Sequence, residues 1–371
     1  IGRIDVLAVS ALALSTRITQ IIWALFKGIT TGASVFVAQA YGAKDFKRLK
    51  RVIQQTLLSS VILVVMLQAI IYITAPSLLS IFKPDADLLR NSLLYLRTVI
   101  FGLPFSIIML VVASVLQGMG NAKVPMNIFN IFFNYILIFG NLGFNPLGIR
   151  GAAVALVLAQ FIGASIGMYV LFGRNGVLGK VGIKDFFKLD VKQVASVYRV
   201  GIPTSLESIF WQFSAIILTK VILTFGNTAM ASYQLGLQAE ALSYMPAMGF
   251  AVAATTFLGQ SLGAKNPEEG KIYLKETMRG SLIITAVSVA LLVFFPRGIM
   301  KLLTNDPEVI NLGAKYLFIM GLVQVPQNMS SVLNGAMRGA GYTSVPMIVA
   351  ATGLWGIRIP LSLALTYYFH T

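Results

Sequence analysis

The chain has 371 residues, 57% of them hydrophobic and 11% charged, with a net charge of +16. A soluble globular domain carries roughly 25% charged residues, so the composition excludes that class, and we expect no nucleic-acid partner for the basic excess. The chain has no cysteine and one histidine, His370. These counts exclude disulfides and a His/Cys metal site.

Ten apolar segments, each of about 20 residues or more, follow one another along the chain. They are longer than the alternating strands of a membrane barrel, so they predict helices. Lipid offers no hydrogen-bond partners, and each span must satisfy its own backbone groups. The predicted fold class is therefore an all-α polytopic membrane protein. The segments lie near 8–38, 52–74, 92–116, 124–145, 149–172, 201–224, 228–258, 276–296, 310–334 and 344–369.

The loops between these segments alternate in charge. One set is rich in lysine and arginine, within 44–51, 174–199 and 265–279 and at Lys123 and Arg338. Positive charge stays on the cytoplasmic side, so this set is predicted to be cytoplasmic and all ten segments to cross. The other set carries only Lys83, Arg90, Arg150, Arg297 and Lys301.

The sequence repeats itself at an offset of 221 residues. Residues 39–44 (Gln-Ala-Tyr-Gly-Ala-Lys) return as 260–265 (Gln-Ser-Leu-Gly-Ala-Lys), and Gly-x-Gly at 118–120 returns at 339–341. Tyr95 likewise matches Tyr316. Internal duplication of an apolar chain is typical of secondary transporters, whose substrate site lies between the repeats.

The offset leaves segments 149–172 and 201–224 without mates. We therefore expect two six-helix lobes related by a pseudo-two-fold axis along the membrane normal, with this chain covering helices 2–11 of about twelve. The predicted domains are an N-terminal lobe at 1–172 and a C-terminal lobe at 200–371. A cytoplasmic linker at 173–199 joins them and is predicted to contain an interfacial helix; a plain solvated linker is the alternative.

The repeated motifs resemble those of the multidrug and toxic compound extrusion (MATE) transporters. They are Gln-x-x-Gly-Ala-Lys at 39–44 and 260–265, Gly-x-Gly-x-x-x-x-Pro at 118–125 and 339–346, and the run Leu147–Ala153. The resemblance implies a two-lobed antiporter that exports drugs or metabolites in exchange for H⁺ or Na⁺ by alternating access. We expect small organic substrates, cationic or amphiphilic, and a monomer whose only other partner is the lipid bilayer. The resemblance implies no cofactor apart from H⁺ or Na⁺ as coupling ion.

The glycines of these motifs also have a structural interpretation. Gly42, Gly120, Gly263 and Gly341 are each predicted just past a helix end, where a positive φ angle caps the last turn. Pro125 and Pro346 follow at the start of the next helix, where a missing N–H is harmless. We expect tight turns here and no binding role.

Two acidic residues fall inside apolar segments, Glu207 and Glu240. Carboxylates at membrane depth are functional candidates by default, and we expect one or both to carry the coupling proton or bind sodium. For Glu207 the alternative is a carboxylate stabilised by a helix N-terminus. For Glu240 the alternative is an ion pair with a nearby basic residue.

The cation sites of the family do not carry over to this chain. Its helix 7 glutamate would fall on Trp211, its helix 10 acid on Gln327, and its helix 5 aspartate on Asn134 after Asn130, so sodium and proton stay open. We expect a substrate cavity with a polar lining of mixed charge. Its predicted residues are Arg17, Gln20, Lys27, Asn127, Asn130, Asn134, Trp211, Gln212, Gln238, Tyr244, Gln327, Asn328 and Arg358.

Functions other than export have weaker support in the sequence. A lipid-linked oligosaccharide flippase is the alternative, with Arg17, Lys27 and Arg358 holding a pyrophosphate. A membrane enzyme would need a cluster of nucleophiles, bases or metal ligands, and a channel a short filter segment; the sequence indicates neither. The sequence has no Walker lysine motif, which argues against direct use of ATP.

Overall fold

The computed structural model describes residues 6–80, 86–121, 148–173, 176, 178 and 187–368. Within these ranges, nine helices are long and apolar enough to cross a membrane. They correspond to nine of the ten predicted spans, and the tenth, 124–145, lies outside the described residues. Most extend beyond the apolar segment that predicts them, because the basic and polar flanks continue the helix.

The first half of the chain contributes α1 (Val6–Gly42), α2 (Phe46–Ser80), α3 (Ala86–Gly118) and α5 (Gly148–Phe172). The second half contributes α7 (Val191–Leu223), α8 (Asn227–Gly263), α9 (Pro267–Phe294), the short α10 (Pro296–Leu303) and α11 (Pro307–Gly339). The last span consists of α12 (Ser344–Ala351), a π-helical stretch Thr352–Arg358, α13 (Ile359–Leu363) and a second π-helical stretch Ala364–Tyr368.

The helix bounds confirm the repeat. The helices α1, α2 and α3 begin 221 residues before α8, α9 and α11, and the ends of α1 and α3 precede those of α8 and α11 by the same number. The second helix of each repeat differs, because α2 runs unbroken to Ser80 whereas α9 stops before Pro296 and α10 follows. The duplication is therefore a property of the fold as well as of the motifs.

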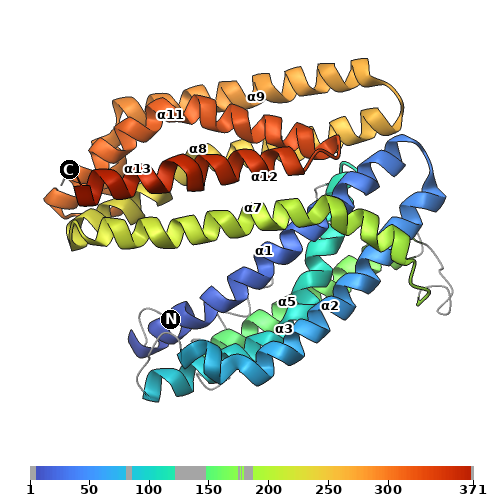
Figure 1. Cartoon of the computed structure of the whole chain (residues 1–371), viewed down its shortest axis with the longest axis horizontal. Helices are drawn as coiled ribbons and strands as arrows, with labels where there is room; N and C mark the ends of the chain where they lie inside the picture. Colours follow the sequence, from blue (N-terminus) through green and yellow to red (C-terminus); the bar gives the residue numbers. More distant parts are fainter. Residues whose placement is uncertain are drawn as a thin grey trace. The chain divides into compact units, whose positions relative to one another are not determined.

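The chain divides into two compact units. The first comprises 1–37, 46–116 and 121–201, and the second comprises 38–45, 117–120 and 202–371. Within the first unit α2, α3 and α5 run side by side (Figure 1). The ring of Phe105 on α3 contacts that of Phe161 on α5, with the ring centroids 5.1 Å apart. Within the second unit α11 packs against α8 and α9.

The predicted linker ends earlier than expected. Residues 191–199, predicted as its last part, form the first turns of α7. The Val/Lys alternation there belongs to a transmembrane helix that simply starts early, with Val197 buried and Val191 exposed. Most of the rest of 173–199 lies outside the described residues.

Two of the predicted turn glycines have the expected conformation. Gly120 has φ 81° and Gly341 has φ 89°. In each turn the N–H of the glycine donates to a carbonyl three residues back and the next N–H to a carbonyl five back, the Schellman arrangement. Pro346 lies in the first turn of α12, as predicted; Pro125 is outside the described residues.

The prediction for Gly42 and Gly263 is wrong. Both are the last helical residues of α1 and α8, and the positive φ angles belong to Lys44 (55°) and Lys265 (57°). These two lysines are the capping residues of two further Schellman turns. Glycine is needed two residues earlier for a different reason, namely the close approach of two helices.

The ends of α1 and α8 cross with their backbones in contact. A Cβ atom at Gly42 would overlap the carbonyl oxygen of Gln260, and one at Gly263 would overlap that of Gln39. Both contacts lie within the second unit, and they are related by the 221-residue offset. A side chain at either glycine would push the helices apart, so the crossing requires glycine at both positions.

The two glutamines at this crossing also bind matched helix ends. The Nε2 of Gln260 donates to the carbonyl oxygen of Gly118 at 2.9 Å, and the Nε2 of Gln39 donates to that of Gly339 at 3.4 Å. Each amide therefore satisfies a carbonyl that a helix end leaves without an intrahelical partner.

Candidate ion-coupling site

A buried carboxylate lies within α8. Glu240 is 3% exposed and lies about 20 Å along the helix from Asn227. Two side chains of α11 donate to it, Tyr316 Oη to Oε2 and Gln324 Nε2 to Oε1, both at 2.8 Å. Gln327 Nε2 is at the limit of hydrogen bonding, 3.5 Å from Oε1.

A second polar contact lies beside Glu240. Asn328 is fully buried, and its Nδ2 donates to the hydroxyl of Ser243 on α8 at 3.1 Å and to that of Thr285 on α9 at 3.0 Å. Together these residues form what we call the C-half polar cluster, which connects α8, α9 and α11. Its members are Glu240, Ser243, Thr285, Tyr316, Gln324, Gln327 and Asn328.

Local sequence places these side chains on facing helix surfaces. Tyr316, Gln324 and Asn328 are spaced at multiples of four residues on α11, so they share one face of the helix. Gly236 lies one turn before Glu240 on α8, and a side chain there would collide with the ring of Tyr316. Glycine at 236 therefore lets the tyrosine reach the carboxylate.

The cluster contains oxygen atoms without hydrogen-bond partners. Gln324 Oε1 and Asn328 Oδ1 are buried and make no hydrogen bond within the described residues. In that same part of the chain, no lysine or arginine makes an ion pair with Glu240. The structure thus does not show the predicted alternative, an ion pair with a basic residue.

The first half carries no such cluster at the matching positions. Tyr95 corresponds to Tyr316 and the buried Ser106 to Gln327, but apolar residues or threonine replace the other members. Residues 221 positions before Glu240, Ser243, Thr285, Gln324 and Asn328 are Thr19, Ile22, Val64, Leu103 and Ile107. The four apolar residues among them are buried. The same helix scaffold therefore forms with an apolar interior at these positions.

The other predicted acid, Glu207, is paired. Arg338 Nη2 is 2.7 Å from Oε1 and 2.8 Å from Oε2, and both side chains are largely buried. The pair joins α7 to the last turn of α11. The alternative of a helix N-terminus is wrong, because α7 begins at Val191, more than four turns before Glu207.

Among the predicted cavity residues that the structure describes, Gln327 and Asn328 belong to the cluster around Glu240, and the charge of Arg358 acts on Tyr316, which donates to Glu240. Gln327 contacts its carboxylate, and Asn328 is enclosed between helices instead of lining an open cavity. Gln212 and Tyr244 are half-buried, while Trp211, Gln238 and Arg358 are exposed. In the first unit, Gln20 is half-buried and Lys27 exposed. Asn127, Asn130, Asn134 and the side chain of Arg17 lie outside what the structure describes.

Several members of the cluster are absent from the predicted site. In the sequence, Tyr316 is distinguished only by its match to Tyr95 in the repeat. Nothing in the sequence distinguishes Gln324, Ser243 and Thr285 from other polar residues. The available signal was the four-residue spacing that joins Gln324 to Asn328. It is weak, because a helix face does not reveal which neighbouring helix it contacts.

Comparison with known proteins identifies the family. A family model described as MatE matches residues 1–142 and 203–364. The chain belongs to the MatE family. A MatE relative from Thermotoga maritima, a probable multidrug resistance protein NorM, is 30% identical over 377 residues, covering all of this chain and 80% of the relative. The probable multidrug resistance protein YoeA of Bacillus subtilis is 27% identical, and the match covers 92% of this chain and 75% of YoeA.

The fold agrees with solved structures of the MatE family. One, described as the outward-facing conformation of a multidrug resistance MATE family transporter, matches with a TM-score of 0.87 and 22% identity, over 99% of this chain and 82% of the other. The family and the nine candidate spans together make the chain a multi-pass cytoplasmic membrane protein. The resemblance predicted from the motifs is confirmed.

Proposed function

We propose that this MatE protein exports small organic compounds in exchange for H⁺ or Na⁺, and that Glu240 is its coupling residue. One observation carries the proposal: Glu240 is buried at membrane depth and makes no ion pair in the described residues. A charge in such a place is costly, and a carboxylate relieves the cost by binding a cation. Glu207 already has this compensation from Arg338, so we assign it a structural role.

The cluster supplies what a coupling site needs. Tyr316 and Gln324 donate to the ionised carboxylate. The free oxygens of Gln324 and Asn328 can ligate Na⁺, because hard cations prefer oxygen ligands. For H⁺ coupling the carboxyl group itself carries the ion.

Cation binding would change how α8 packs against α11. Pro246 in α8 and Pro326 in α11 lie near the cluster and interrupt the helical hydrogen bonds there. Neutralising Glu240 alters its bonds to Tyr316 and Gln324, and a cation that binds one conformation better shifts the balance toward it. This is the step that would link the ion gradient to alternating access.

Substrate export rests on the relatives. The relatives from Thermotoga maritima and Bacillus subtilis described above are named as probable multidrug resistance proteins, which supports organic compounds as substrates. The same relatives do not favour a lipid-linked oligosaccharide flippase.

Transport by the full-length protein in liposomes tests the proposal. A fluorescent organic cation would be loaded and an H⁺ or Na⁺ gradient imposed separately, so that the effective gradient identifies the ion. We expect Glu240→Gln to lose gradient-driven transport, because an amide cannot take up H⁺ and loses the charge that attracts Na⁺. Glu308→Gln, at the exposed start of α11, is the control. Coupled transport by Glu240→Gln at the wild-type rate would refute the assignment.

A further inference from the structure

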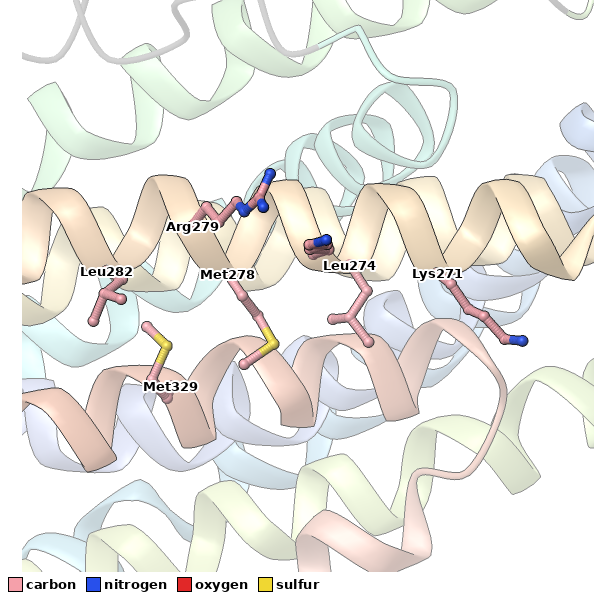
Figure 2. Close-up of a pocket in the computed structure, with 7 residues that line it drawn as sticks. Lys271, Leu274, Met278, Arg279, Leu282 and Met329 are labelled. Carbon is pink, nitrogen blue, oxygen red and sulfur yellow. The ribbon is translucent and has the colours of Figure 1, made fainter.

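A groove of about 370 Å³ lies on the surface of the second unit, between α9 and α11. We call it the α9–α11 groove. Leu274, Met278 and Leu282 of α9 and Met329 of α11 give it an apolar lining. Figure 2 shows Leu274 and Met278 extending from α9 toward the helix that carries Met329. The groove is separate from Glu240 and has no part in the proposed coupling.

Three basic residues lie along the groove. Lys271, Lys275 and Arg279 line it and are spaced four residues apart, so they form one stripe along the first turns of α9. The loop charges predict that this end of α9 faces the cytoplasm. The stripe would then lie at the depth of the inner-leaflet headgroups, with the apolar lining continuing toward the acyl chains.

The stripe keeps positive charge available for a ligand. Lys275 is exposed and makes no ion pair within the described residues. Lys271 and Arg279 each contact a glutamate of their own helix at 2.7 Å, but these pairs are more than half exposed. Exposed pairs of this kind contribute little, so a phosphate can replace them as partner.

The matching face of the first half is different. Residues 221 positions before Lys271, Lys275 and Arg279 are Lys50, Gln54 and Leu58, of which Leu58 is buried. Protein covers part of this face, where Gln54 is half-buried and Leu58 buried, whereas Lys50 is exposed. The second half leaves its equivalent face open and makes it basic.

We propose that the α9–α11 groove binds an anionic phospholipid of the inner leaflet. Its phosphate would contact Lys271, Lys275 and Arg279, and one acyl chain would lie against Leu274, Met278 and Met329. Basic side chains beside an apolar groove between transmembrane helices are complementary to such a lipid on both counts. A zwitterionic phospholipid also carries a phosphate, but the cation of its headgroup cancels the net negative charge that the stripe would attract.

Native mass spectrometry of the full-length protein tests the proposal, with phosphatidylglycerol and phosphatidylcholine offered in equal amounts. We expect preferential retention of phosphatidylglycerol. Each basic residue contributes about fivefold to affinity, so Lys271→Gln/Lys275→Gln/Arg279→Gln should lower retention by about 100-fold. The control, Lys47→Gln/Lys50→Gln/Lys192→Gln, removes the same charge from exposed sites of the first unit and should retain the lipid.

A second variant separates the lipid from a free anion. Met329→Trp fills the groove without changing its charge and should also reduce phosphatidylglycerol retention, whereas soluble glycerol phosphate should not displace the lipid. Equal retention of the two lipids by the wild type would overturn the proposal. So would equal loss in the triple variant and its control, or full retention by Met329→Trp.

Discussion

The two halves of the chain build the same three helices but fill matching interior positions differently. The second half buries a carboxylate and two amides between α8, α9 and α11, and the first half buries mainly aliphatic side chains there. Since the scaffold forms in both cases, the polar residues are not needed to make it. Burying these polar groups costs free energy that folding does not require, so we infer that they are kept for a function, which we take to be cation coupling. The paired positions are Glu240 and Thr19, Gln324 and Leu103, and Asn328 and Ile107.

The largest expected effect is a loss of stability when Glu207 loses its ion-pair partner, Arg338. Arg338→Met leaves Glu207 buried without its partner, which should cost about 3 kcal/mol of stability. Glu240→Gln creates no unpaired charge, so its change should stay within about 1 kcal/mol. Unfolding of the purified proteins in detergent measures both. Equal destabilisation by the two substitutions would remove the distinction between these acids.

The next largest effect is a loss of stability when a methyl group is added where α1 and α8 cross. Gly42→Ala and Gly263→Ala each place a methyl group against the other helix's backbone, and each should cost about 2 kcal/mol. Gly249→Ala is the control, because its Cβ meets no atom within 4 Å; helix propensity should make that change neutral or favourable. A protein that tolerates alanine at 42 but not at 263 would break the symmetry of the crossing.

Transplanting first-half residues into the polar cluster tests the central comparison. Gln324→Leu/Asn328→Ile should raise stability by about 1 kcal/mol, since two buried amides with unsatisfied oxygens are removed. Gradient-driven transport should fall, because Glu240 loses a donor and the site loses two oxygen ligands. If the double variant unfolds more readily than the wild type, the amides hold the helices together and our interpretation fails.

The smallest effect concerns the four matched turns. Lys44→Gly and Lys265→Gly should each stabilise the protein by about 0.5 kcal/mol, because both lysines have positive φ angles. The reciprocal Gly341→Lys should lose about 1 kcal/mol. Thermal unfolding in detergent resolves the direction of each change. A loss of stability in Lys265→Gly would mean that its side chain makes a compensating contact.

Sequence alone predicts much of this fold. Hydropathy indicates the nine described spans, and the 221-residue offset predicts which helices correspond. Gly120 and Gly341 are identified as capping residues because their motif is local. Gly42 and Gly263 are misassigned because their reason is a crossing between helices more than 200 residues apart, which a turn pattern does not contain.

The candidate site is predicted less completely. Glu240 stands out because acids are rare in apolar segments, but its partners Tyr316 and Gln324 are 76 and 84 residues away in the chain. Arg338 is identified from the sequence as a cytoplasmic loop charge and as part of a turn motif, and neither pattern indicates that it pairs with Glu207. Local periodicity gives the face of a helix, and only the packed structure shows which faces meet.

Cation release on substrate binding is the most direct test of the coupling assignment. Adding substrate to the weakly buffered, purified full-length protein should release about one H⁺ or Na⁺ per molecule, as reciprocal coupling between two ligands requires. We expect no release from Glu240→Gln and normal release from Glu308→Gln. Release from Glu240→Gln equal to that of the wild type would show that the coupling cation binds elsewhere.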